Sequence, residues 1–240
     1  MIYYTGDIHG RPQGIQAYFK KYAPSQDDTL VILGDVGANF YRNETDKKVK
    51  EVLDSLGLTV LCIHGNHEIR PANIPTYQQK VWKGGLVWYE PEFPNLLFAR
   101  DGEIFTIEDI RHLVIGGAYS VDKYYRLEKG YGWWEDEQPS AEIKEYVERQ
   151  ILHKPFDIIL SHTCPAKFKP TEAFLPGIDQ SSVDESTEVW LDKIEENAPY
   201  KLWLCGHWHI DKRVGKMCFF FHTFVDSEEI KGELRLCKKE

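Results

Sequence analysis

Short apolar runs alternate with more polar, helix-like stretches through the first 64 residues of the chain. The runs at 1–5, 29–33 and 58–64 have the length of buried strands. The stretches between them, 12–22 and 43–57, open with a proline in the first turn and with an asparagine N-cap, so both are predicted to be helices. Strands that alternate with helices are typical of an α/β fold.

The middle of the chain follows a different pattern. Short apolar runs separated by turn residues at 84–120 predict antiparallel strands. An aromatic and charged stretch follows at 121–139, and Ser140 caps a predicted helix that ends near His153. The remaining predicted elements are a strand at 156–162, a helix at 184–197 and closing strands at 201–205, 216–222 and 232–237. We expect the segments 84–120 and 201–237 to build a second sheet.

The length allows one large domain or two small ones, and we expect a single domain over residues 1–240. Its 42% hydrophobic and 28% charged residues are typical of a globular protein. No run approaches the roughly 18 apolar residues of a membrane-spanning helix. Five scattered cysteines form no C-x-x-C motif and predict reduced thiols, hence a cytoplasmic location. A net charge of −9 argues against non-specific binding to nucleic-acid backbone.

Asp, His and Asn residues follow the ends of five predicted strands. Functional sites of open α/β folds gather at the carboxyl ends of strands, so we expect these side chains to form one site. They are Asp7, His9, Asp35, Asn66, His67, His162, His207 and His209. In an extended segment, residues two apart point to the same side, so His207 and His209 should face one target.

The donor types of this set indicate a metal site. Carboxylate, amide and imidazole ligands without cysteine suit Mn, Fe or Zn, and we favour Mn. The set exceeds the four ligands of a structural zinc site and suffices for two divalent ions that share a bridging carboxylate. Pairs of ions are a recurring device for displacement at phosphorus. An isolated H-x-H would more simply be two structural histidines. Five predicted strand ends that are each followed by Asp, His or Asn favour a functional site instead.

Five sequence blocks occur in a fixed order between residues 6 and 209: "GDIHG", "GDVGAN", "GNHE", "SH" and "GHWH". In this combination the chain resembles the calcineurin-like metallophosphoesterase superfamily, in particular its small bacterial and phage-type members. The resemblance implies a four-layer αββα sandwich of two mixed β-sheets flanked by helices. It also implies hydrolysis of phosphate esters, in which hydroxide held by the metals attacks phosphorus in line.

The resemblance implies a role for each residue at the strand ends. Asp35 would bridge the two ions, and His67 would contact phosphate and act as the general acid for the leaving group. The other ligands would divide into Asp7, His9 and His209 for one ion and Asn66, His162 and His207 for the other.

The second block departs from the family pattern, because Ala38 stands where a carboxylate commonly orients the histidine corresponding to His67. We expect Asp122 or Glu68 to replace it, since a general acid needs an orienting partner. The candidate substrate-binding residues are Asn39, Arg70, Asp122 and Arg126. The aromatic segment at about 119–139 is interpreted either as a substrate cover or as a surface excursion.

The leading hypothesis is a two-metal hydrolase of small phosphoesters, with phosphodiesters or nucleotides ranked slightly first. The alternatives are a Ser/Thr protein phosphatase or a phosphomonoesterase. The protein phosphatase is disfavoured because Asn39 and Phe40 stand where that class has Arg and Gly. A non-catalytic metal-binding scaffold ranks last, since every predicted ligand position is filled. The sequence leaves the oligomeric state open.

Overall fold

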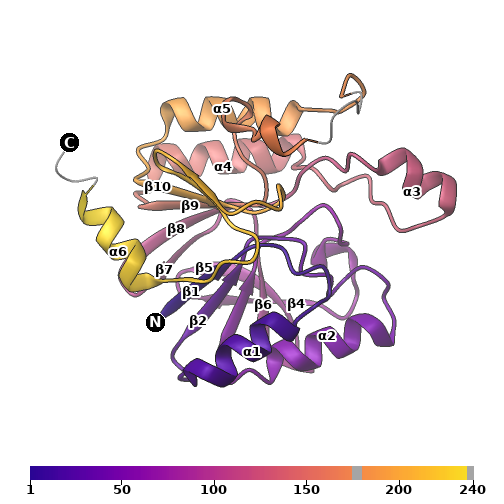
Figure 1. The fold of residues 1–240 in the computed structure, drawn as a ribbon, viewed down its shortest axis with the longest axis vertical. Coiled ribbons are helices and arrows are strands. Elements are labelled where there is room, and N and C mark those ends of the chain that lie inside the picture. Colours follow the sequence, from indigo (N-terminus) through magenta and orange to yellow (C-terminus); the bar gives the residue numbers. More distant parts are fainter. Residues whose placement is uncertain (175–179, 237–240) are drawn as a thin grey trace.

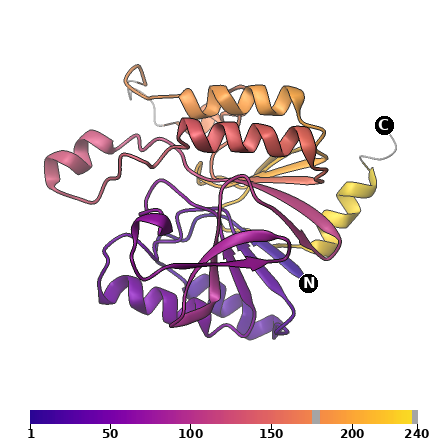
Figure 2. The ribbon, with the colours of Figure 1, turned by 180° about the vertical axis from the view of Figure 1, so that it is seen from behind.

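The computed structural model describes residues 1–174 and 180–236, which form two mixed β-sheets packed face to face (Figure 1). Helices lie on the outer face of each sheet, as the view from behind also shows (Figure 2). The four-layer sandwich predicted from the sequence is therefore confirmed.

Parallel strands form the centre of the first sheet, and antiparallel strands lie at its edges in the order β13-β1-β2-β3-β6-β5-β4. The parallel strands are β1 (Ile2–Thr5), β2 (Thr29–Ile32), β3 (Thr59–Cys62) and β6 (Phe93–Ala99). The antiparallel strands are β13 (Val225–Asp226), β5 (Gly85–Glu90) and β4 (Gln78–Trp82). The carboxyl ends of β1, β2 and β3 are consequently neighbours.

The second sheet has the same design, in the order β11-β12-β10-β9-β8-β7. Its parallel strands are β8 (Ile110–Ile115), β9 (Ile158–Ser161), β10 (Leu202–Cys205) and β12 (Met217–Phe219). Its antiparallel edges are β7 (Ile104–Ile107) and β11 (Lys212–Val214).

The helices divide between the two outer faces. The first sheet is covered by α1 (Gln13–Tyr22) and α2 (Glu44–Asp54), and the second by α4 (Ala141–His153) and α5 (Ser186–Asn197) (Figure 1). The short helix α3 (Lys123–Lys129) projects away from the body, and α6 (Ser227–Leu236) ends the described chain. Single 3₁₀ turns occur at η1 (Pro71–Asn73), η2 (Ala166–Phe168) and η3 (Thr171–Ala173).

Three apolar clusters hold the four layers together. Strand residues alternate between two of them, because successive side chains point to opposite faces. In β1, for example, Ile2 and Tyr4 enter the cluster between the sheets, whereas Tyr3 packs beneath α1 with Phe19. The third cluster lies between the second sheet and its helices and includes Trp203. Both faces of the central strands are buried, which explains their nearly continuous apolar runs.

One polar pair crosses the otherwise apolar layer between the sheets. The Tyr4 hydroxyl on β1 lies 2.7 Å from Nε2 of His112 on β8, and both side chains are fully buried. Burial lowers the pKa of His112 to about 4, so its imidazole is neutral near pH 7 and can accept from the tyrosine hydroxyl.

Two sequence predictions about the second sheet are wrong. The segment 84–120 splits between the sheets, because β5 and β6 extend the first sheet and only β7 and β8 join the second. The closing strand predicted at 232–237 is instead part of α6, as far as the described residues reach; Cys237 lies outside them. Ile230 and Leu234 are four residues apart, on one face of this helix, and both pack against the central cluster.

None of the described helices combines the length and the apolar character that a membrane span requires.

Candidate metal centre

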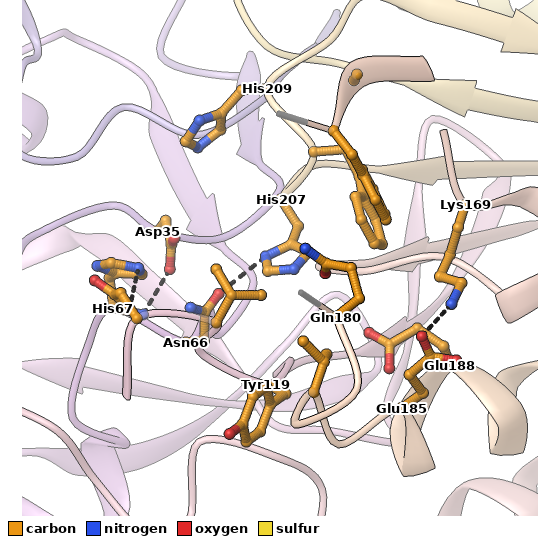
Figure 3. Close-up of a pocket in the computed structure, with 16 residues that line it drawn as sticks. Asp35, Asn66, His67, Tyr119, Lys169, Gln180, Glu185, Glu188, His207 and His209 are labelled. Atoms are coloured by element: carbon orange, nitrogen blue, oxygen red, sulfur yellow. Dashed lines mark hydrogen bonds and ion pairs between the residues drawn. The ribbon is translucent and has the colours of Figure 1, made fainter. Parts of the chain in front are cut away.

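The residues predicted at the strand ends lie together, although they come from both sheets. Figure 3 shows five of them around one cavity: Asp35, Asn66, His67, His207 and His209. The loops after β1, β2 and β3 bring Asp7, His9, Asp35, Asn66 and His67 from the first sheet. The loops after β9 and β10 bring His162, His207 and His209 from the second. The two sheets therefore share one site, as expected for parallel strands that end at the same edge.

Asp7, His9 and His209 form one group of potential ligands. The His9 and His209 Nε2 atoms are 2.8 Å apart, and His209 Nε2 lies 3.3 Å from Asp7 Oδ2. That buried carboxylate oxygen has no hydrogen-bond partner among the described residues. A buried acceptor without a donor, faced by two imidazoles, is the arrangement that a cation would satisfy.

Asn66, His162 and His207 form the second group. Asn66 Oδ1 lies 2.8 Å from His162 Nε2 and 3.0 Å from His207 Nδ1. The Asn66 amide donates from Nδ2 to Ser120 Oγ at 3.0 Å, which turns its oxygen toward the histidines. His162 donates from Nδ1 to the Leu33 carbonyl at 2.8 Å, so its Nε2 carries the free lone pair.

Asp35 lies between the two groups. Its Oδ2 is 3.9 Å from His9 Nδ1, and its Oδ1 is 3.5 Å from His162 Nε2 and accepts from the His67 backbone N–H at 2.8 Å. Burial acts to raise the pKa of Asp35, but the imidazoles of His162, His67 and His9 outweigh it and lower the pKa to about 2. The carboxylate is therefore ionised at every physiological pH.

Two of the candidate ligands, His9 and His207, are poised as neutral imidazoles. Burial lowers the pKa of His9, against the opposing effect of Asp35 and Asp7. Burial, together with neighbouring His162, holds the pKa of His207 well below its ordinary value. The carboxylate of Asp7 raises the pKa of His209. Because metal binding requires deprotonated ligands, His9 and His207 need to release no proton near pH 7.

Several candidate ligands lie on backbone with a strained conformation. Among the described residues, nine non-glycine residues have positive φ, and four of them are candidate ligands: His9, Asp35, His207 and His209. Such conformations cost about 1–3 kcal/mol each and concentrate at functional sites. The extended H-x-H geometry expected from the sequence is wrong, because φ is 67° at His207 and 50° at His209. The turn still directs both rings into the centre, one to each group.

Close backbone approach explains the glycine before Asn66. A Cβ on Gly65 would overlap the carboxylate and backbone nitrogen of Asp35, so only glycine lets the loops after β2 and β3 meet.

The family comparison bears directly on this arrangement. The model of the calcineurin-like phosphoesterase family matches residues 1–211. The chain belongs to this family. The resemblance predicted from the five sequence blocks is therefore confirmed, as is the prediction of a hydrolase acting on phosphoester bonds. No curated protein matches the phosphoesterase.

Solved structures share its fold at low identity, and 28 chains match. The crystal structure of TT1561 of Thermus thermophilus is 13% identical, with 98% of this chain and 95% of that chain covered, at a TM-score of 0.54. Another structure is 14% identical, with 91% and 88% covered, at a TM-score of 0.50. The protein of unknown function AQ665 from Aquifex aeolicus is 14% identical, with 97% and 98% covered, at a TM-score of 0.44. The first two support the fold alone.

His67 of the phosphoesterase lies beside the two ligand groups, close to a carboxylate from the segment 119–139. Its Nε2 is 3.9 Å from Asp122 Oδ1, a buried oxygen without a hydrogen-bond partner among the described residues. Glu68, the other carboxylate considered, is fully buried and accepts from the Gly65 N–H at 3.1 Å. Burial raises the pKa of Glu68 to about 8. Asp122 is therefore the carboxylate that faces His67.

The remaining predicted substrate residues serve internal contacts. Asn39 is buried and accepts from the Tyr77 hydroxyl at 2.9 Å. Arg70 donates to Asp101 at 2.5 Å and to the Asp136 carbonyl at 2.7 Å. The structure does not bring these two side chains to the ligand groups.

Arg126 acts on the centre through a buried network. It donates to Ser120 Oγ at 3.0 Å, and Ser120 Oγ in turn donates to Glu137 Oε2 at 2.5 Å. Because Ser120 also accepts from Asn66, the base of the segment 119–139 supports a candidate ligand. The two aromatic residues of α3, Tyr124 and Tyr125, are instead exposed.

Sequence reasoning missed most of the cavity that opens on the centre. Its additional lining residues include Tyr119, Lys169, Phe174, Glu188 and Trp208. Trp208 could have been noticed, because it stands between His207 and His209. Tyr119 begins the aromatic segment 119–139, for which a substrate cover is one interpretation. Lys169, Phe174 and Glu188 lie in segments without a motif, and only the fold brings them to the site.

Proposed function

We propose that the protein is a two-metal-dependent hydrolase of phosphate esters. The observation that carries this proposal is the pair of ligand groups on either side of the ionised Asp35. Asp7, His9 and His209 would hold one ion, and Asn66, His162 and His207 the other, with Asp35 between them. Two such ions would stabilise charge on the phosphoryl oxygens and make a bound water more acidic.

We infer that His67 protonates the leaving oxygen. Its ring lies next to the ligand groups, 5.4 Å from the His9 ring between centroids, and lines the cavity where an ester would bind. Asp122 faces Nε2 and would keep the ring oriented for proton transfer. A distance of 3.9 Å is longer than a hydrogen bond, but catalytic contacts commonly tighten when substrate binds.

We further expect Mn²⁺ as the preferred ion and phosphodiesters or nucleotides as the preferred esters. The mixed carboxylate, amide and imidazole donors support the first expectation. The aromatic walls of the cavity support the second, since they suit a ring-bearing ester. A cytoplasmic location stays a prediction, supported by the reduced thiols of Cys62, Cys164 and Cys205.

The proposal is tested by removing metal from the protein and adding back Mn²⁺, Fe²⁺ or Zn²⁺ separately. Each form is assayed on bis-p-nitrophenyl phosphate, p-nitrophenyl phosphate, cyclic nucleotides and a phosphopeptide, and bound metal is measured by elemental analysis. We expect two ions per chain and metal-dependent hydrolysis of at least one small ester. Two bound ions without hydrolysis of any ester would instead identify a non-catalytic scaffold, and hydrolysis of the phosphopeptide alone a protein phosphatase.

A further inference from the structure

The cavity beside the metal centre is larger than a phosphate group requires. Its volume is about 450 Å³, and it runs from Asp35, Asn66 and His207 to Lys169 and Glu188 at the far side (Figure 3). Cavities of about 300–1,000 Å³ typically hold small organic ligands. The space beyond the ligand groups can therefore receive the organic part of an ester.

Aromatic side chains form part of the cavity wall. The rings of Phe174 and Trp208 are nearly parallel, at an interplanar angle of 11° and a centroid distance of 5.7 Å. Trp208 also lies against His207, with ring centroids 5.0 Å apart. Tyr119 and Val121 line the same cavity. A planar ring packed on these side chains would thus be close to a phosphate held at the ligand groups.

Glu188, in the first turn of α5, supplies a buried carboxylate to this largely apolar space. It is 5% exposed, and its Oε1 accepts from the Thr163 hydroxyl at 2.9 Å. The nearby cation offsets its charge only in part, because the Lys169 ammonium forms its ion pair with Glu185. Burial raises the pKa of Glu188 even though a backbone N–H, the Thr163 hydroxyl and the charge of Lys169 act to lower it, which reflects the cost of keeping a charge there. A ligand that brings N–H groups would offset that cost.

We propose that this cavity binds the base of a nucleoside phosphoester and that Glu188 accepts a hydrogen bond from the amino group of the base. The inference rests on the proposed function, which it narrows to one substrate class. Adenine, guanine and cytosine carry such an amino group, whereas uracil presents a carbonyl oxygen where cytosine has its amine. A carboxylate facing that carbonyl would bury two acceptors without a proton between them.

The test compares two synthetic diesters that differ only in the base, cytidine and uridine 5′-(4-nitrophenyl phosphate). Release of p-nitrophenol by the Mn²⁺-loaded protein gives kcat/KM for each. The cytidine ester should be preferred by about 10- to 100-fold, the value of one hydrogen bond to a charged group. Glu188→Gln should bring the ratio close to one, because a glutamine amide can pair with either base. Glu196→Gln, a control at an exposed carboxylate of the same helix, should keep the wild-type ratio.

The outcomes separate this inference from the proposed function. Hydrolysis of bis-p-nitrophenyl phosphate with equal rates for the two nucleoside esters would overturn the base site and leave the hydrolase standing. A wild-type preference that persists in Glu188→Gln would overturn the role of this carboxylate. If no ester is hydrolysed, the proposed function fails, and calorimetric binding of CMP against UMP by the Mn²⁺-loaded protein decides the base site. The ratio of kcat/KM for the cytidine and uridine esters is measured on the wild-type protein. It therefore tests the base site even if Glu188→Gln fails to fold.

Discussion

The buried pair between the sheets should make the protein sensitive to mild acid. His112 has a pKa of about 4 in the folded protein, against about 6.5 for an exposed histidine. The folded-state pKa is lowered, so the unfolded chain binds a proton first as the pH falls. Stability should therefore decrease from about pH 6.5 downward and level off near pH 4.

The size of this effect follows from the two pKa values. A difference of about 2.5 pKa units corresponds to about 3 kcal/mol when the titration is complete, and to about 2 kcal/mol at pH 5. Such a loss is a sizeable part of the roughly 5–15 kcal/mol that stabilises a typical domain. The Tyr4 hydroxyl provides the only hydrogen bond that the described side chains make to the imidazole. It does not remove the cost of burying a charged ring.

His112→Gln isolates the contribution, because glutamine can still accept from Tyr4 but does not titrate. Urea unfolding of the metal-free proteins, followed by tryptophan fluorescence, should be measured at several pH values between about 7.5 and 5. The free energy of unfolding of the wild type should fall by about 2 kcal/mol more than that of His112→Gln over this range. His153→Gln, at an exposed histidine, serves as the control and should follow the wild type. Parallel pH dependence of wild type and His112→Gln would refute the argument.

Three further predictions concern the centre itself. Asp35→Asn should abolish turnover and lower the metal content of both positions, since one carboxylate serves both groups; elemental analysis that still finds two tightly bound ions would contradict this. His67→Ala should slow the hydrolysis of alkyl esters by about 10²–10⁴-fold and that of p-nitrophenyl esters far less, because a stable leaving group needs little protonation. Asp122→Asn should show the same contrast more weakly. Equal losses of rate on both esters would exclude acid catalysis. Gly65→Ala should weaken metal binding, measured by titration calorimetry, because its Cβ would displace Asp35, whereas Gly14→Ala, whose Cβ would meet nothing within 4 Å, should bind metal normally.

Much of the centre could be predicted because it depends on a rule that the sequence displays directly. Buried parallel strands appear as apolar runs, and polar residues that follow them lie at one edge of the sheet. Asp7, Asp35 and Asn66 can be found in this way. The backbone turn at His207 cannot, since nothing in a short H-x-H distinguishes extended from left-handed residues.

The predictions that are wrong concern features that depend on contacts between distant segments. A run such as 84–90 has the pattern of a strand, but the sheet that it joins is decided by packing against strands far away in the sequence. The segment 232–237 is short and apolar in alternation, and its helical spacing becomes clear only when Ile230 is included. Glu188 reaches the cavity from a helix of the second sheet, so no local pattern connects it with the metal ligands.

Because the ligands are divided between the two sheets, binding of an ion is linked to the association of the sheets. Each ligand group combines side chains of both sheets, since His209 faces Asp7 and His162 and His207 face Asn66. An ion bound there would connect the two sheets, and separation of the sheets would break its coordination. By linkage, a bound ion raises the free energy needed to separate the two sheets, and a solute or substitution that populates the separated form weakens ion binding. A low concentration of the ion would then shorten the lifetime of the folded chain and also remove its catalytic activity.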